Sequence, residues 1–206
     1  MKRTLLILAA FVLTLGGIGI AANFAEDTKA KAPAAEPLAA EHKVLAKHVG
    51  NWSITGSFND PTGKAITVSG EATIELILGD RFLYEESKTV TADGNACQGR
   101  GFMGFNTGDN AYQALFISEK MNGMKVMNGA YDADLKAVVY SGAKVNPETK
   151  QSLNVRVEVR FETDDKFVVQ FFCSESVDPA IQPSPRDAEP KKPVERKEGE
   201  LIYTRK

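Results

Sequence analysis

The feature that most constrains this chain is the alternation of apolar and polar side chains along most of its length. Within residues 152–162 every second residue is Leu, Val or Phe, and Ser, Asn, Arg and Glu stand between them. Successive side chains of a β-strand point to opposite faces, so this period of two is typical of antiparallel strands with one buried and one solvated face. The pattern therefore predicts an all-β protein.

Segments of this kind follow one another, separated by short runs rich in Gly, Asn and Asp that are typical of turns. We expect strands at 51–59, 65–78, 81–91, 96–105, 111–119, 125–131, 136–145, 151–163, 167–175 and 199–205. Every connection but the last is too short for a crossover helix, which makes the order an antiparallel meander. Closing a meander of about ten strands removes its exposed edges, so the predicted fold is a β-barrel and a two-sheet sandwich is the alternative.

One helix is expected ahead of the strands, from residue 37 to residue 49. Four residues share one of its faces at helical spacing, namely Leu38, His42, Leu45 and Val49. Pro37 stands at a tolerated first-turn position, and Gly50 is expected to end the helix in a left-handed cap. We expect His42 to pack on the apolar stripe, and His48 to be exposed or to act as a cation at the helix C-terminus.

The first 25 residues have the features of a secretory signal peptide. Two basic residues, Lys2 and Arg3, precede an apolar run that ends in small residues near Ala21. Residues 26–36 lack large apolar side chains and are expected to form a flexible tether. We therefore expect export to the periplasm or the extracellular space, with no stable membrane span after cleavage; an uncleaved anchor is the alternative.

Export would place Cys97 and Cys173 in an oxidising compartment, where they could form one disulfide. The alternative is two small buried residues in strands. Residues 176–198 contain five of the nine prolines and a mixed run of charges. This composition predicts a flexible surface loop at one mouth of a barrel domain spanning 37–206. The alternative is a lid or a docking segment in polyproline geometry.

Several functional classes lack support in the sequence. A net charge of -2 provides no basic surface for nucleic acid. The two histidines cannot share a metal from one helix face, and no zinc or calcium motif is present, so neither a metal nor a cofactor is predicted. Met121, Met124 and Met127 could bind cuprous copper, although flexible apolar filling of a barrel end also explains them. Residues 99–104 match a dinucleotide-binding glycine pattern, but no helix follows, and the glycines suit a tightly coiled strand or space for a ligand.

The tripeptide Gly50-Asn51-Trp52, together with Arg205 in the closing strand, resembles the calycins, the superfamily of lipocalin-like barrels. In lipocalins a Gly-x-Trp at the start of the first strand packs beneath an arginine from near the end of the chain. The resemblance implies that Trp52 and Arg205 close one end of the barrel, where a cation-π contact is worth roughly 0.5 to 2 kcal/mol.

A narrower resemblance covers about residues 43–205. Ordered segments at 45–52 (LAKHVGNW), 78–83 (LGDRFL), 99–106 (GRGFMGFN), 128–132 (NGAYD) and 203–206 (YTRK) resemble domain of unknown function 1579. That family consists of uncharacterised, often exported bacterial proteins. It implies a calycin-type barrel and no established activity, and the proline-rich insertion before the last strand departs from its pattern. Haem-binding barrels of the nitrobindin type take a histidine from late in the chain, whereas none follows His48 here.

These observations favour a barrel that binds a small apolar or amphipathic molecule in its interior. The side chains expected to line it are Tyr84, Met103, Phe116, Arg156 and Phe171. The alternative is an interaction or structural module of the cell envelope that uses the proline-rich loop or the outer face.

An enzyme is the third possibility, with Glu85 or Glu86 as an acid-base group. These neighbours point to opposite faces of one strand, so the turn at Gly79-Asp80 decides which of them lies inside. One register places Arg81, Leu83 and Glu85 in the interior, and the other places Phe82, Tyr84 and Glu86 there.

Overall fold

The computed structural model describes residues 36–60, 62–145, 149–175 and 194–206. The expected signal peptide, the tether apart from Glu36, and residues 176–193 of the expected proline-rich loop lie outside the described residues. Every element described below belongs to the unit Pro37–Lys206. In this part of the chain, no helix has the length and apolar character needed to cross a membrane.

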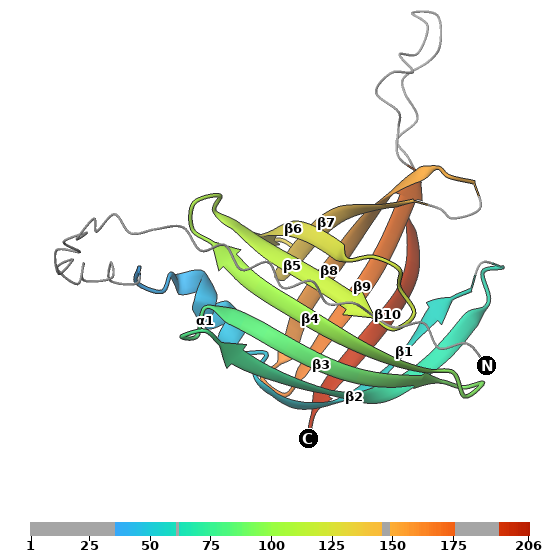
Figure 1. Cartoon of the computed structure of the whole chain (residues 1–206), viewed down its shortest axis with the longest axis horizontal. Helices are drawn as coiled ribbons and strands as arrows, with labels where there is room; N and C mark the ends of the chain where they lie inside the picture. Colours follow the sequence, from blue (N-terminus) through green and yellow to red (C-terminus); the bar gives the residue numbers. More distant parts are fainter. Residues whose placement is uncertain (1–35, 61, 146–148, 176–193) are drawn as a thin grey trace, which may run out of the picture. The chain divides into compact units, whose positions relative to one another are not determined.

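In the described part of the chain, one short helix precedes ten strands (Figure 1). The helix α1 spans Ala40–Ala46. The strands are β1 (Gly50–Asn59), β2 (Ala65–Ile77), β3 (Phe82–Thr91), β4 (Ala96–Asn106), β5 (Ala111–Ser118), β6 (Lys125–Asp132), β7 (Ala137–Val145), β8 (Ser152–Thr163), β9 (Lys166–Glu175) and β10 (Arg196–Arg205). Nine of the ten begin and end within one residue of the expected positions. The last begins at Arg196 instead of 199, so residues 196–198 of the expected loop are part of a strand.

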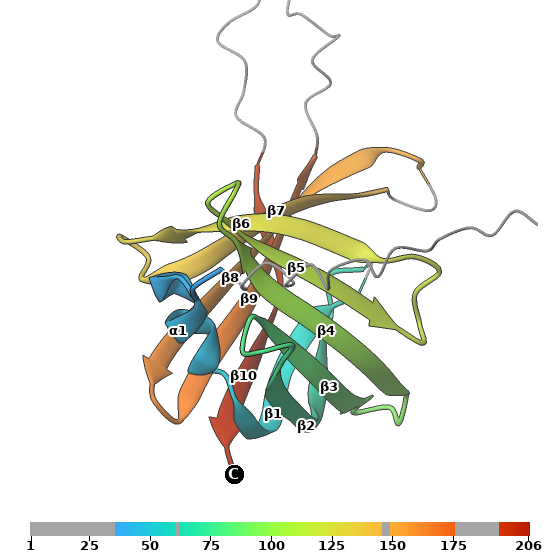
Figure 2. The same ribbon diagram turned by 60° about the vertical axis from the view of Figure 1, so that its left-hand side comes forward.

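The strands form a closed antiparallel barrel in the order β1-β10-β9-β8-β7-β6-β5-β4-β3-β2. Each strand pairs with its neighbours in sequence, and β1 closes the ring by pairing with both β2 and β10 (Figure 2). Trp52 stands opposite Ala72 on one side and opposite Arg205 on the other. The predicted meander and its closure are confirmed, and the two-sheet sandwich is excluded.

The helix is shorter than expected and lies at the barrel end where β4 finishes (Figures 1 and 2). Its N-cap is Ala39, whose backbone N–H donates to Nδ1 of His42 at 3.0 Å, so Pro37 lies before the helix instead of in its first turn. Gly50 is the first residue of β1 and has a φ of 144°, which is not the left-handed cap that we expected. Glycine is needed there because a Cβ would overlap the guanidinium of Arg205.

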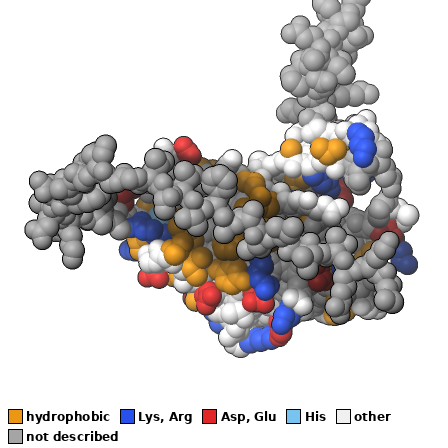
Figure 3. Space-filling view, in the orientation of Figure 1, with side chains coloured by type: hydrophobic (Ala, Val, Ile, Leu, Met, Phe, Trp, Pro, Cys, Tyr) orange, Lys and Arg blue, Asp and Glu red, His pale blue; other side chains and the backbone are white. Residues whose placement is uncertain are grey.

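The outer face of the barrel is less uniformly polar than the alternation predicts. Four outward side chains stand in register across neighbouring strands, namely Tyr84, Phe102, Leu115 and Val126. Phe102 is 39 % exposed and Val126 is 60 % exposed. Figure 3 shows apolar side chains gathered over this region of β3, β4 and β5. The expectation of a solvated outer face is therefore wrong for these strands.

Candidate functional site

One end of the barrel is sealed by Trp52 and Arg205. The indole is fully buried, and the guanidinium carbon of Arg205 lies 4.2 Å from the centre of its ring. Trp52 donates from Nε1 to the carbonyl of His48 at 2.8 Å, and Arg205 donates from Nη1 to the carbonyl of Val49 at 2.8 Å. The last strand thus locks the segment between α1 and β1 across the barrel end. This is the closure that the lipocalin resemblance implies, and we call this end the floor.

His48 lies at the floor and is only 4 % exposed, which corrects the expectation of an exposed or cationic residue. Its Nδ1 lies 3.1 Å from the carbonyl of Leu45, so Nδ1 carries the proton, and Nε2 is left as a buried acceptor without a partner among the described residues. The rings of Phe161 and Phe167 contact the imidazole edge to face. Burial among these rings lowers the pKa of His48 to about 4 because the charged form would lose its hydration.

Above the floor the barrel interior holds a cavity of about 470 Å³. Most of its wall is apolar, including Ile54, Phe58, Met103, Phe116, Met127, Val157 and Phe171. Toward the opposite end of the barrel the wall becomes polar, with Asn59, Thr89, Lys125, Lys144 and Glu198. We call this end the mouth. The cavity exists because inward positions on β4 and β5 hold small residues, notably Gly99, Gly101 and Ala114.

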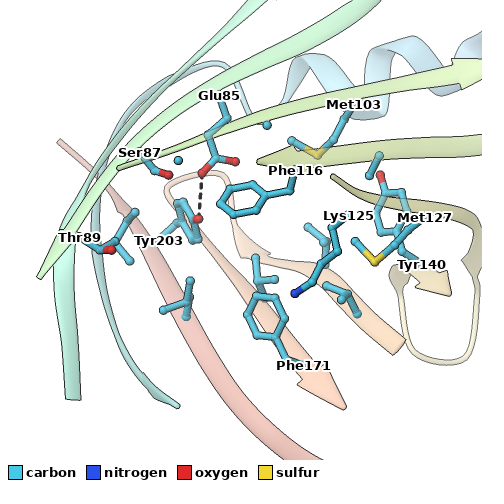
Figure 4. A pocket seen from close by; sticks show the side chains of 18 of the residues that line it. Glu85, Ser87, Thr89, Met103, Phe116, Lys125, Met127, Tyr140, Phe171 and Tyr203 are labelled. Atoms are coloured by element: carbon cyan, nitrogen blue, oxygen red, sulfur yellow. Dashed lines mark hydrogen bonds between the residues drawn. The ribbon is translucent and has the colours of Figure 1, made fainter. Parts of the chain in front are cut away.

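A hydrogen-bonded pair crosses the deeper part of the cavity (Figure 4). Tyr203 on β10 donates its hydroxyl proton to Oε1 of Glu85 on β3 at 3.0 Å. Burial raises the pKa of the Glu85 carboxyl, and the Tyr203 hydrogen bond opposes this by favouring the carboxylate. The phenol pKa of Tyr203 is raised by burial and by the neighbouring Glu85. The pair can offer an oxygen acceptor to a ligand or, when Glu85 is protonated, a second donor.

The turn between β2 and β3 determines which glutamate lies inside. Leu78, Gly79 and Asp80 all have positive φ values, between 52° and 69°, and the register pairs Ile77 with Phe82. This phase turns Leu83 and Glu85 inward and leaves Tyr84 and Glu86 outside. Outside the barrel, Glu86 forms an ion pair with Arg100 at 3.1 Å.

The glycines of β4 provide room for the side chains that meet in the cavity. A Cβ on Gly99 would lie 2.6 Å from the ring of Phe116, and one on Gly101 would lie 3.4 Å from Cβ of Glu85. A side chain at position 99 would therefore overlap the Phe116 ring, whereas a Cβ at position 101 would make only an ordinary contact with Glu85. Space for the Phe116 ring is therefore one role of this glycine run.

Lys125 places a cationic group in the cavity, and the sequence pattern did not predict this residue in the lining. It is the first residue of β6, and Figure 4 shows its amine directed into the interior between the side chains of Phe116 and Phe171. Burial lowers its pKa, and repulsion from Lys144 lowers it further, while the nearby Cys173 acts in the opposite direction. Lys125 lies two residues before the inward-facing Met127 on β6, so the alternation of the strand could have predicted that Lys125 faces inward.

Three of the five side chains expected in the lining belong to the cavity wall: Met103, Phe116 and Phe171. The other two expectations are wrong. Tyr84 lies outside, where its ring packs 5.2 Å from that of Phe102. Arg156 lies outside because Val155 and Val157 occupy the inward positions of β8. Its Nε donates to Glu195 at 2.8 Å, its guanidinium also pairs with Glu158, and it lies over the ring of Phe172.

The sulfur-bearing residues do not form the sites considered from sequence. Cys97 and Cys173 are both free thiols, on strands that are not neighbours in the barrel. Met127 lies in the cavity wall, whereas Met124 is 68 % exposed, so these thioethers do not face a common point.

Comparison with known proteins places this chain among barrel proteins. The S-type phycobiliprotein lyase CPES from Guillardia theta matches with a TM-score of 0.52 at 10 % identity, over 81 % of this chain and 92 % of that one. Rv2717c from M. tuberculosis matches with a TM-score of 0.52 at 14 % identity, over 82 % of this chain and 99 % of that one. At these identities the likeness shows the fold alone. The curated proteins contain no match to this chain.

The family described as protein of unknown function (DUF1579) matches residues 37–179, which include α1 and the strands β1 to β9. The match covers more than half of the chain and includes the segments that carried the resemblance in the sequence, apart from the last. The chain belongs to the DUF1579 family.

Proposed function

We propose that this protein binds one small amphipathic molecule inside the barrel. The observation that supports the proposal is the cavity of about 470 Å³, with apolar walls and the Glu85–Tyr203 pair in its deeper part. Sites for small molecules are typically concave, largely apolar and about 300 to 1,000 Å³ in volume, with a few polar groups that fix orientation. The cavity has each of these properties.

The apolar wall would hold the body of the ligand, and the polar pair would fix its depth. Met103, Phe116 and Phe171 line the space with flexible or flat side chains that adapt to an apolar surface. A ligand hydroxyl or carbonyl near Glu85 would complete the hydrogen bonding of a group that burial makes costly to leave ionised. We propose further that the chain is exported and that residues 1–25 are removed, so binding takes place outside the cytoplasm.

Native mass spectrometry of the protein isolated from its own host tests this function. Ala114 stands opposite Met103 on β4 and Met127 on β6, so Ala114→Phe would place a ring inside the cavity. Gln113→Phe adds the same ring to the outer face of the same strand and is the matched control. We expect an additional mass on the wild-type protein and the control, and its loss from Ala114→Phe.

Circular dichroism would establish that both variants are folded. Fluorescence of added 1-anilinonaphthalene-8-sulfonate provides a second measurement, because a weakly held ligand can be lost during isolation. A wild-type protein that carries no additional mass and takes up no such probe would overturn the proposed function.

A further inference from the structure

Two lysines face the same part of the cavity at its mouth. Lys125 begins β6 and Lys144 lies one residue before the end of β7, and β6 and β7 are neighbours in the barrel. Both residues line the cavity. Their charges are close enough for Lys144 to lower the pKa of Lys125. Two cations therefore stand side by side at the entrance to an apolar space.

No carboxylate among the described residues neutralises this pair. Within residues 36–60, 62–145, 149–175 and 194–206, the side-chain amine of neither Lys125 nor Lys144 forms an ion pair or a hydrogen bond. The acidic residue that shares the mouth is Glu198, and it pairs with Arg196 at 3.4 Å. Glu85 is held deeper in the cavity by its hydrogen bond from Tyr203.

The lack of an ion-pair partner matters for Lys125 because its side chain is half-buried. Most exposed lysines are satisfied by water, but Lys125 is half-buried, and its register partner on β5 is the inward ring of Phe116. Figure 4 shows its amine pointing into the cavity instead of away from the protein. Partial loss of hydration is offset most effectively by an anion within hydrogen-bonding distance, since charge-assisted hydrogen bonds are the strongest of their kind.

We propose that the ligand is a single-chain amphiphile whose anionic head group lies between Lys125 and Lys144. This inference rests on the proposed function and specifies the chemical class of its ligand. The apolar chain runs from the mouth along Phe116 and Phe171, and a hydroxyl or carbonyl further along that chain would meet the Glu85–Tyr203 pair. The orientation is fixed because an anion at the deep end would meet Glu85, whereas at the mouth it meets two cations. A cationic head group is excluded from the mouth by the same lysines.

Four dodecyl compounds that share one chain and differ in head group test the proposal. They are dodecanoate, dodecyl phosphate, 1-dodecanol and dodecyltrimethylammonium, each used below its aggregation concentration with protein freed of bound ligand. Isothermal titration calorimetry at pH 7.5 gives the dissociation constants. We expect the anions to bind at least about tenfold more tightly than dodecanol, and the cation to bind most weakly. The ratio between dodecanoate and dodecyl phosphate identifies the preferred anion.

Substitution of the lysines separates the head-group contact from the cavity itself. Lys125→Met with Lys144→Met keeps two long apolar side chains in place, and we expect it to weaken dodecanoate about tenfold without changing dodecanol. Lys88→Met removes an exposed lysine from the outer face of β3 and is the control, with no effect expected on either compound.

Three results would decide against the proposal. Equal affinity for dodecanol and both anions, or an equal loss of dodecanol and dodecanoate in the double variant, would overturn the anionic head-group assignment while leaving ligand binding intact. Failure of all four compounds and of the fluorescent probe to bind the wild-type protein would instead overturn the proposed function on which it rests.

Discussion

The guanidinium of Arg205 lies 4.2 Å over the indole of Trp52, which joins the end of the last strand to the start of the first. The same side chain donates from Nη1 to the carbonyl of Val49 and from Nη2 to the carbonyl of Asp164. It therefore links the segment before β1 with the turn between β8 and β9. Closure of the floor is a contact among three parts of the chain that are distant in sequence.

Arg205→Met should lower the free energy of unfolding by about 2.5 to 4 kcal/mol. A cation-π contact is worth about 0.5 to 2 kcal/mol, and each net hydrogen bond adds about 1 kcal/mol. Lys206→Met is the control, because it removes only an exposed ion pair with Glu71, and exposed ion pairs contribute little to stability. Urea denaturation followed by circular dichroism measures both. Equal losses in the two variants would mean that the contact over Trp52 stabilises the fold no more than the exposed ion pair does.

The strands could be predicted from the sequence because each buries one face. Burial imposes an alternation that a single strand displays by itself, and every expected strand is present. The sequence predicts too long a helix because the apolar stripe continues to Val49, whereas α1 ends at Ala46. There the chain leaves the helix so that the carbonyls of His48 and Val49 can accept from Trp52 and Arg205.

The candidate site was only partly predictable because its polar residues break the pattern that located the strands. Glu85 and Lys125 occupy inward positions, which alternation alone assigns to apolar side chains. The phase of β3 depends on the turn from Leu78 to Asp80. A positive φ is uncommon for leucine, so residue preferences do not predict the conformation of Leu78. The outward row that includes Tyr84 breaks the alternation in the other direction, because apolar side chains occupy outward positions that the pattern assigns to polar residues.

Stability should fall as the pH is lowered from 7 to 5 because of His48. Its pKa is about 4 in the folded protein and 6.5 ordinarily, so over this range the unfolded chain binds a proton that the folded protein does not. Protonation then favours unfolding by about 2 kcal/mol between pH 7 and pH 5. Urea denaturation of the wild type and of His48→Phe, which cannot titrate at this position, isolates the effect.

Some carboxylates have lowered pKa values in the folded protein, such as Asp60, Asp93 and Glu200. Their stabilising effect is lost only when the pH falls below their ordinary pKa values, so they do not obscure the comparison between pH 7 and pH 5. Glu85 is common to both proteins and cancels in the difference. A difference between wild type and His48→Phe that stays constant from pH 7 to pH 5 would show that the imidazole titrates normally.

The Glu85→Gln variant should become more stable relative to the wild type as the pH rises above 4.5. The pKa of Glu85 is raised by burial, so the folded protein holds this proton to higher pH than the unfolded chain does. Wild-type stability is therefore lost as the pH rises through that interval, whereas the amide has no proton to release. The amide oxygen can still accept from Tyr203. Thermal denaturation at pH 5 and pH 8 measures the change, and an advantage that shrinks with pH would contradict it.

Tyr203→Phe should raise the pKa of Glu85 further. The Tyr203 hydroxyl donates to Oε1 of Glu85 at 3.0 Å and favours its ionised form, so its removal leaves burial unopposed. The carboxyl carbon resonance of Glu85, assigned by its absence in Glu85→Gln, gives the titration midpoint by carbon NMR. Tyr84→Phe removes a hydroxyl from the next side chain on β3, outside the barrel, and should leave the midpoint unchanged. A midpoint that falls or stays constant in Tyr203→Phe would mean that the hydrogen bond does not stabilise the carboxylate, and that the deep end of the cavity is more solvated than its contacts indicate.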